Sequence, residues 1–442
     1  MKLGPVGTRW SGAVLGLVAA GLYLVGSSRS FDNDEAITFA NFVVPGSLWA
    51  VLGGRTSIEH TYRSVTGTTD HVAVSVLSHL VYVATGTHSE FAYRIFPALA
   101  AGAAIAVLFI VLVERFGLLA GGIPAVFMAT AQAWVLEARQ MRGYSLMVLL
   151  AILASVVLRS GLGSRRRRAG YVALMAGAMA AQLFALLLLP VHLAYVAAAR
   201  PSELRKSAVA AAAAGAVGLA VNALAIANSV QMLAGKQPRL FRPDFPKAVV
   251  MDLVGGPFPI AVAFGLAGVV LGAFALRRKR WVGYPVAVLA VMVAFLWLVV
   301  QPMWLYPRFF LFILPGAMYL VAAGLKRWPL VAPLVLIGAV FSVLGQLPGY
   351  TAEPMSLPVA ARLVNASRAA GGNPCVLEGD QLEILAYTNQ YSIASRTDQL
   401  PGCDLVVIVA WSADPRLEQA AFDGFPRHTV LTGQTTGLLL TR

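Results

Sequence analysis

Phe31-Asp32-Asn33-Asp34-Glu35-Ala36 follows the first long apolar run of the chain, which extends from Trp10 to Gly26. It places three carboxylates within four residues beside a candidate membrane span. Charge is costly to hold at the edge of a span, and where it occurs it often marks function. Ordinary solvated loop acids are the alternative interpretation. The arginines elsewhere in the chain help to decide between a functional site and ordinary loop acids.

The composition of the chain indicates a polytopic membrane protein. Of its 442 residues, 58% are hydrophobic and only 12% are charged, about half the charged fraction of a soluble domain. The net charge of +14 comes in short clusters between apolar runs, which favours membrane orientation and phosphate contacts over nucleic acid. Lys2 and Arg9 precede the first run as in a signal peptide. No clear Ala-x-Ala-like site follows, so we expect a retained first helix.

Eleven apolar runs are candidate membrane spans, since a span needs about 20 apolar residues, or fewer where it is partly buried. The run 170–199 is divided near Gln182, because a single helix there breaks the charge pattern downstream. The segment 72–86 is apolar but short, so we expect an interfacial helix in the first outer loop. The expected spans are 10–29, 93–113, 118–136, 144–159, 170–184, 185–199, 207–227, 257–276, 282–300, 307–325 and 328–347.

Lys and Arg in the short loops set the orientation of such a protein. With the N-terminus inside, every dense basic run falls on the cytoplasmic side, whereas counting 72–86 as a span would put the four arginines 165–168 outside. The inner loops then hold only Glu114 and Glu203 as acids, and the outer side carries both acids and cations. We therefore expect a multi-pass protein of a bacterial-type plasma (inner) membrane, with its active site on the extracytoplasmic side.

The composition changes near Tyr350. It divides the chain into a transmembrane domain, residues 1–349, and a small extracytoplasmic α/β domain, residues 350–442. Cys375 and Cys403 each precede an apolar run that predicts a buried strand, so a disulfide forms if the two strands are neighbours, and two free thiols are the alternative. Further strands are expected at 427–432 and 436–441, and helices at 357–370 and 414–422.

Two acidic motifs in the first outer loop are candidates for chemistry. Asp34 and Glu35 stand at the end of the first span, where a carboxylate can act as general base toward a hydroxyl. Asp70 and His71 stand at the outer end of the 72–86 helix, where they could bind a divalent metal or position an acceptor. Asp70 is also a good helix N-cap type, and both roles can hold together.

Arginines at two other outer boundaries are candidates for binding phosphate. Arg139 and Arg142 are three residues apart, so on a helix they would share a face. Two guanidiniums suit a phosphate through bidentate hydrogen bonds, and snorkelling to lipid phosphates is the alternative. Arg308 follows Tyr306 at another boundary, where aromatic-belt anchoring is the alternative. The basic outer loop 228–256 is either a flap over an anionic ligand or a plain solvated loop.

The order and spacing of these elements resemble the membrane-embedded glycosyltransferases of the GT-C class. The resemblance is closest to the group of the protein O-mannosyltransferases and the aminoarabinose transferase that modifies lipid A. It covers roughly residues 10–325. The matching elements are Asp34-Glu35, Asp70-His71 with His79 in the helix that follows, residues 89–94, Glu137 through Tyr144, and Tyr306 to Arg308 before Leu314-Pro315.

The resemblance implies a role for each candidate residue. Asp34 would be the catalytic base, and Glu35 a supporting acid or acceptor-positioning group. Asp70 would line the same cavity and is the candidate metal ligand, a divalent metal being the one cofactor considered. The phosphate of a polyprenyl-phosphate sugar would be bound by Arg139, Arg142, Tyr144, Tyr306 and Arg308.

The expected function is therefore inverting transfer of a sugar from a polyprenyl-phosphate donor to an acceptor hydroxyl. The acceptor is a lipid, a glycan or a protein, membrane lipids surround the protein, and no nucleic acid is expected as a partner. A transporter or flippase for a lipid-linked or anionic solute is the alternative. It would place ionisable residues in the middle of spans, often in related halves. Few charges occur mid-span in this chain, which favours the enzyme.

Overall fold

The structure is a computed structural model in which the chain forms two compact units. The first unit comprises residues 1–24, 70–74 and 94–347, and the second comprises 25–69, 75–93 and 348–442. The domain boundary expected between residues 349 and 350 remains a prediction. The structure describes residues 4–25, 27, 35, 38–39, 43–44, 51, 71–227, 243–254, 259–300, 306–351, 357–377, 392–394, 397–409, 415–425, 427–431 and 437–441.

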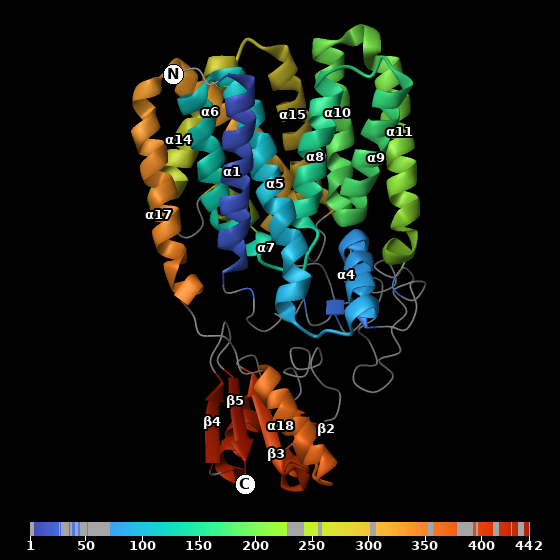
Figure 1. Ribbon diagram of the computed structural model, residues 1–442, viewed down its shortest axis with the longest axis vertical. Coiled ribbons are helices and arrows are strands. Elements are labelled where there is room, and N and C mark those ends of the chain that lie inside the picture. The colour runs from blue at the N-terminus through green and yellow to red at the C-terminus, as the bar shows by residue number, and fades with distance from the viewer. Residues whose placement is uncertain are drawn as a thin grey trace. The chain divides into compact units, whose positions relative to one another are not determined.

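The first unit is a bundle of helices (Figure 1). Its α-helices are α1 (Pro5–Leu24), α5 (Glu90–Phe116, from Arg94 onward), α6 (Leu118–Thr130), α7 (Gln132–Ala138), α8 (Tyr144–Arg159), α9 (Arg165–Ala181), α10 (Leu188–Ala199), α11 (Leu204–Val221), α13 (Phe245–Val254), α14 (Pro259–Leu276), α15 (Arg280–Phe295), α16 (Leu314–Arg327) and α17 (Ala332–Thr351). Short helical segments of other types are η2 (Leu183–Leu187), η3 (Pro201–Glu203), η4 (Leu296–Val300), η5 (Pro307–Ile313) and η6 (Pro329–Val331).

Each expected span coincides with a helix or a pair of successive helices in this bundle. Within the described residues, five helices are long and apolar enough to cross a membrane, or six if the bent pair α6–α7 is one span. The protein is thus an α-helical multi-pass membrane protein. The total of eleven spans stays a prediction, because several of the helices, such as the 16 residues of α8, are short for a span.

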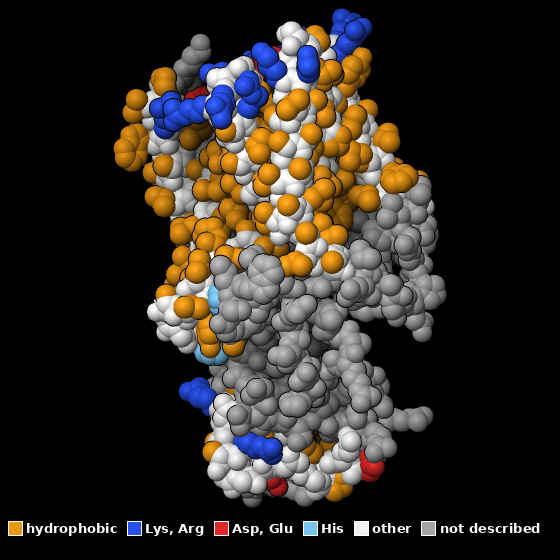
Figure 2. Space-filling model, turned by 90° about the vertical axis from the view of Figure 1, so that its right-hand side faces the viewer, with side chains coloured by type: hydrophobic (Ala, Val, Ile, Leu, Met, Phe, Trp, Pro, Cys, Tyr) orange, Lys and Arg blue, Asp and Glu red, His pale blue; other side chains and the backbone are white. Residues whose placement is uncertain are grey.

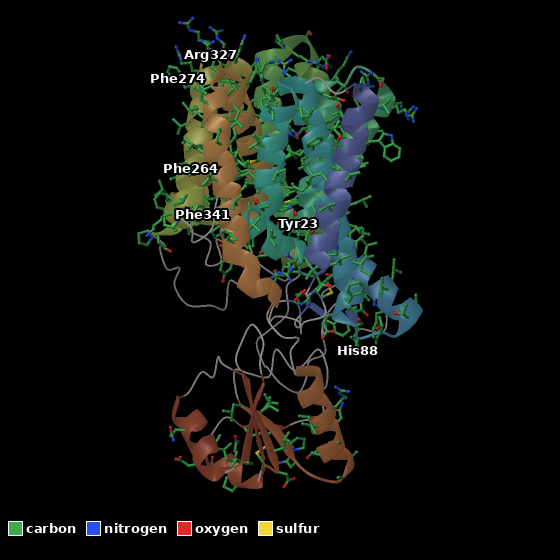
Figure 3. All side chains as sticks on the ribbon, turned by 60° about the vertical axis from the view of Figure 1, so that its left-hand side comes forward. Tyr23, His88, Phe264, Phe274, Arg327 and Phe341 are labelled. Carbon is green, nitrogen blue, oxygen red and sulfur yellow. A yellow bond between two sulfur atoms is a disulfide. The ribbon has the colours of Figure 1, made fainter. Side chains whose placement is uncertain are left out.

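The span expected over 118–136 is not one continuous helix, because α6 and α7 meet at a 60° bend. Side chains from distant parts of the chain satisfy the carbonyl groups beside the bend. Tyr23 on α1 (Figure 3) donates to the carbonyl oxygen of Ala129 at 2.8 Å, and Ser342 on α17 donates to that of Thr130. A membrane helix can break only where its backbone groups find such partners.

The close approach of α1 and α5 depends on two small residues. A Cβ added at Gly16 would lie 2.5 Å from the carbonyl oxygen of Gly102, and a Cβ at Gly102 would overlap the backbone of Gly16 in the same way. Small residues of this kind let membrane helices pack backbone against backbone. This contact places Tyr23, near the end of α1, beside the α6–α7 bend.

The C-terminal part of the second unit is a small α/β domain around a five-stranded sheet with strand order β2-β1-β3-β5-β4. β1 is parallel to β2 and β3, and β5 is antiparallel to β3 and β4. The elements are α18 (Leu357–Ala369), β1 (Pro374–Leu377), β2 (Ser392–Ala394), η7 (Thr397–Gly402), β3 (Leu405–Val409), α20 (Pro415–Gly424), β4 (Arg427–Leu431) and β5 (Gly437–Thr441).

The predicted helices and four of these strands are confirmed, whereas β2 was not predicted. β2 is only three residues long, too short for its sequence pattern to identify it. Cys375 on β1 and Cys403 before β3 form a disulfide with a Cα–Cα distance of 5.7 Å. β1 and β3 are neighbouring strands, as the sequence analysis required for this disulfide to form.

Candidate functional site

The predicted site residues are not all within the described part of the chain. Asp34 and Asp70 lie outside it, so their roles as base and metal ligand remain predictions. Glu35 is described and fully buried, and it belongs to the second unit. His71 belongs to the first unit, as do all five predicted phosphate-binding residues.

Arg139 and Arg142 lie in a bend between α7 and α8. The Arg139 amide donates to the carbonyl of Leu136 at 3.2 Å, and the Arg142 amide donates to that of Gln140 at 2.7 Å. Because α7 ends at Ala138, the premise that both arginines share a helical face is wrong. Their side chains are nonetheless only 3% and 7% exposed. Snorkelling keeps a guanidinium in water or among headgroups, so such burial argues against that alternative.

Gly143 fixes the bend against the end of α9. A Cβ at this position would overlap the carbonyl oxygen of Ala181 and lie 2.7 Å from its carbonyl carbon. Both are backbone atoms that cannot rotate away, so the contact requires glycine. The sequence motif contains Gly143, but only the folded chain shows what the glycine is for.

His71 contacts the same place. Its Nδ1 lies 2.9 Å from the carbonyl oxygen of Ala181 and 3.3 Å from the amide nitrogen of Gly143. One ring nitrogen cannot donate and accept at once, so the shorter contact favours Nδ1–H donating to Ala181. The ring also meets Tyr144 edge-on, with centroids 4.9 Å apart. His71 thus positions the arginine bend, and its acceptor or metal role remains a prediction.

Aromatic packing by η5 brings Tyr306 and Arg308 to this region. Phe309 stacks on Tyr144 with a centroid distance of 6.4 Å and on Phe184 with one of 4.8 Å. The guanidinium carbon of Arg308 lies 4.6 Å from the ring centroid of Tyr306, which is a cation–π contact. The fold therefore joins Tyr144, Tyr306 and Arg308 in one cluster, although Tyr144 and Tyr306 are 162 positions apart in the sequence.

A cavity of about 600 Å³ lies beside η5, within the range of roughly 300–1,000 Å³ that is typical of ligand pockets. Acids and cations both line it. Glu137 on α7 is only 5% exposed, and Asp244 stands one residue before α13. The described lining residues are Gln132, Ala133, Leu136, Glu137, Asp244, Lys247, Ala248, Met251, Tyr306, Pro307 and Arg308.

This lining includes Tyr306 and Arg308 but not Arg139, Arg142 or Tyr144. Sequence reasoning did not select Glu137 or Asp244 as site residues. Both acids were assigned to the outer side, and nothing in their spacing shows that α13 packs against α7 and η5. Two acids and two cations in one cavity can bind a ligand that carries both hydroxyl groups and a negative charge.

The structure offers no ready metal centre in its described part. Among the described residues, no three His, Cys, Asp or Glu side chains are close enough together to hold a metal ion. In the second unit, His79 Nδ1 lies 2.7 Å from the carbonyl oxygen of Val43, and the ring of His88 packs edge-on against Phe39. These histidines have structural partners, and the metal at Asp70 remains a prediction.

No protein-family model matches the sequence, and no curated protein matches it significantly. Solved structures of GT-C enzymes share its fold over most of the chain, so the protein is a multi-pass membrane protein with a GT-C fold. The apo crystal structure of ArnT from Cupriavidus metallidurans has a TM-score of 0.64 at 12% sequence identity, over 96% of this chain and 97% of that chain.

Two further structures are similar. ArnT from Cupriavidus metallidurans bound to undecaprenyl phosphate has a TM-score of 0.58 at 13% identity, again over 96% of this chain and 97% of that chain. The Archaeoglobus fulgidus oligosaccharyltransferase, in a complex with Zn and sulfate, has a TM-score of 0.49 at 12% identity, over 92% of this chain and 69% of that chain.

Proposed function

We propose that the protein is an inverting glycosyltransferase that transfers a sugar from a polyprenyl phosphate to an acceptor hydroxyl. The observation that carries this proposal is the burial of Arg139 and Arg142 at the α7–α8 bend. Guanidiniums in a low-dielectric site suit a phosphate, which they bind through bidentate hydrogen bonds. The fold supports the same donor class, since ArnT of this fold was crystallised with undecaprenyl phosphate.

In the reaction, the acceptor oxygen attacks the anomeric carbon on the face opposite the phosphate. The glycosidic C–O bond forms as the bond from the anomeric carbon to the phosphate oxygen breaks, and its electron pair leaves with the polyprenyl phosphate. The Asp34 carboxylate takes the hydroxyl proton. Arg139, Arg142 and Arg308 stabilise the charge on the departing phosphate. A phosphate leaves without protonation, so the second carboxylate of a glycosidase is not required.

The remaining candidates support this step. Glu35 positions the acceptor, Tyr144 and Tyr306 hold the phosphate beside the arginines, and His71 keeps the arginine bend against α9. Asp70 is the residue that would hold a divalent metal. No step above depends on that metal, and chelation before assay tests it.

We place the reaction on the extracytoplasmic side of a bacterial-type plasma membrane, with a lipid, glycan or protein as acceptor. The support is the asymmetry of the loops, because Lys and Arg gather at one end of the apolar helices (Figure 2) and such loops remain cytoplasmic. Labelling of a cysteine introduced at exposed Arg165 with a membrane-impermeant reagent tests this orientation. Modification in intact cells would contradict it.

The experiment that tests the function compares wild type with Asp34→Asn in nanodiscs. Each protein is incubated with a panel of short-chain polyprenyl-phosphate sugars and candidate acceptors, and release of polyprenyl phosphate is followed. We expect release by wild type and by the control Asp423→Asn, whose carboxylate is exposed in the C-terminal domain, but not by Asp34→Asn. Equal release by all three proteins would remove Asp34 from the chemistry.

A further inference from the structure

A second cavity, of about 760 Å³, lies among α5, α8, α10, α15 and α16. Its walls are mainly apolar, with Leu112, Ile152 and Leu289 among them. Arg115, Arg159 and Arg200 also line it. Arg115 and Arg159 stand in the last turns of α5 and α8, and Arg200 directly follows α10. The groove is therefore apolar along its length and cationic at one end, and the proposed transfer reaction does not use it.

Ser155 and His192 in the groove wall are hydrogen-bonded within the protein. Ser155 donates to the carbonyl of Ala151 at 2.8 Å, so its oxygen can only accept from His192 Nε2 at 3.1 Å. His192 Nδ1 must then accept from the Tyr171 hydroxyl at 3.0 Å. This chain of hydrogen bonds fixes a neutral imidazole with both nitrogens partnered. This part of the wall, away from the arginines, thus presents a neutral histidine among apolar side chains, which suits a hydrocarbon occupant.

The arginine end of the groove has the character of a headgroup site. Within the described part of the chain, the exposed guanidinium groups of Arg115 and Arg159 make no hydrogen bond or ion pair. Arg200 is different, because it pairs with Glu203 at 3.9 Å. Another acid, Glu114, is exposed next to Arg115. Two cations of the groove therefore remain available to an anionic ligand.

Aromatic rings stand at the same end. Trp281 meets Tyr195 and Tyr319 edge-on, with a centroid distance of 6.4 Å in each case. Trp and Tyr concentrate at the depth of lipid headgroups, and basic pockets between membrane helices bind anionic ones. α15 carries Trp281, and none of its apolar window is buried inside the protein. The groove can thus be entered from the bilayer.

We propose that this groove binds an anionic phospholipid, with an acyl chain along the apolar walls and the phosphate at Arg115 and Arg159. The groove extends to Phe312 and Ile313 of η5, the segment that also carries Arg308. A bound lipid therefore supports the segment on which the arginine of the candidate site is placed. The proposal does not rest on the glycosyl transfer reaction, since lipid binding is measured without any donor.

The test uses the full-length protein, delipidated in detergent and titrated with phosphatidylglycerol while native mass spectrometry records the bound lipid. The double variant R115Q/R159Q removes both available cations. The control R165Q/R166Q removes the same charge from exposed arginines that do not line the groove. Each arginine near a lipid phosphate contributes about 1 kcal/mol, so we expect R115Q/R159Q to bind about thirtyfold more weakly and the control to match wild type.

A second variant fills the groove and leaves its charges in place. Gly316 lines it, and a Cβ at this position meets nothing within 4 Å, so Gly316→Leu should fold and exclude the acyl chain. Equal losses in the two double variants would overturn the proposal in favour of general charge attraction. Phosphatidylcholine bound as tightly as phosphatidylglycerol, unchanged binding by Gly316→Leu, or displacement of the lipid by undecaprenyl phosphate would overturn it as well.

Discussion

Gly143→Ala tests whether the arginine bend must touch the end of α9. The new methyl group would overlap the carbonyl oxygen of Ala181 and lie 3.0 Å from His71 Nδ1, so α8 and α9 must separate. Overpacking a buried contact costs about 1–3 kcal/mol. A shift of about 1 Å in groups that position a substrate lowers the rate by about a hundredfold. We therefore expect a lower melting temperature and a kcat/KM for the donor reduced by about two orders of magnitude.

Gly170→Ala is the matched control, because it lies on α9 and a Cβ there meets no atom within 4 Å. Melting temperature is measured in detergent by intrinsic fluorescence, and kcat/KM by release of polyprenyl phosphate in nanodiscs. If Gly143→Ala equals the control in both quantities, the packing argument is refuted. A lower melting temperature with unchanged kcat/KM would separate the bend from donor binding.

Three further changes test other contacts. Arg308→Lys keeps the charge but loses the planar group over a tyrosine ring, so the donor KM should rise about tenfold with less change in kcat; an unchanged KM would exclude Arg308 from donor binding. Tyr23→Phe leaves the Ala129 carbonyl without its side-chain donor, which should destabilise the bundle by about 1–3 kcal/mol in thermal unfolding; a melting temperature equal to that of wild type contradicts this. Cys375→Ser opens a disulfide with a sequence separation of 28, which should destabilise the C-terminal domain by about 3–4 kcal/mol and speed its proteolysis. Reduction of the wild type should have the same effect. Equal proteolysis of the wild type, the reduced wild type and the variant would contradict this prediction.

The positions of the helices could be predicted because apolar length is a local property of the sequence. The runs at 144–159 and 257–276, for example, became α8 and α14 with bounds within two residues of those expected. The bend between α6 and α7 could not be predicted in this way. It depends on donors from Tyr23 and Ser342, which are more than 100 residues away along the chain, and the bent segment itself is as apolar as a straight span.

The candidate site, too, could be predicted only in part from local sequence. The sequence selected Arg139 and Arg142 from residue type and position at a membrane boundary; the structure shows both buried, and their role stays a prediction. Their placement on one helical face was wrong, because α7 ends before them. Spacing arguments assume a regular helix, whereas here the close contact of Gly143 with Ala181 sets the backbone. The cavity acids Glu137 and Asp244 come together only through the packing of α13, which leaves no signal in either local sequence.

These irregular segments share a physical cause. A straight helix satisfies its own backbone groups and presents only side chains, so a site built on it has few polar groups to arrange. The α6–α7 bend, the Arg139–Gly143 bend and η5 all depart from regular α-helix geometry within one unit. In a membrane such departures persist only where the protein itself supplies partners. Arg139 and Arg142 are buried in one of these segments, which is where the proposed function places the phosphate of the donor.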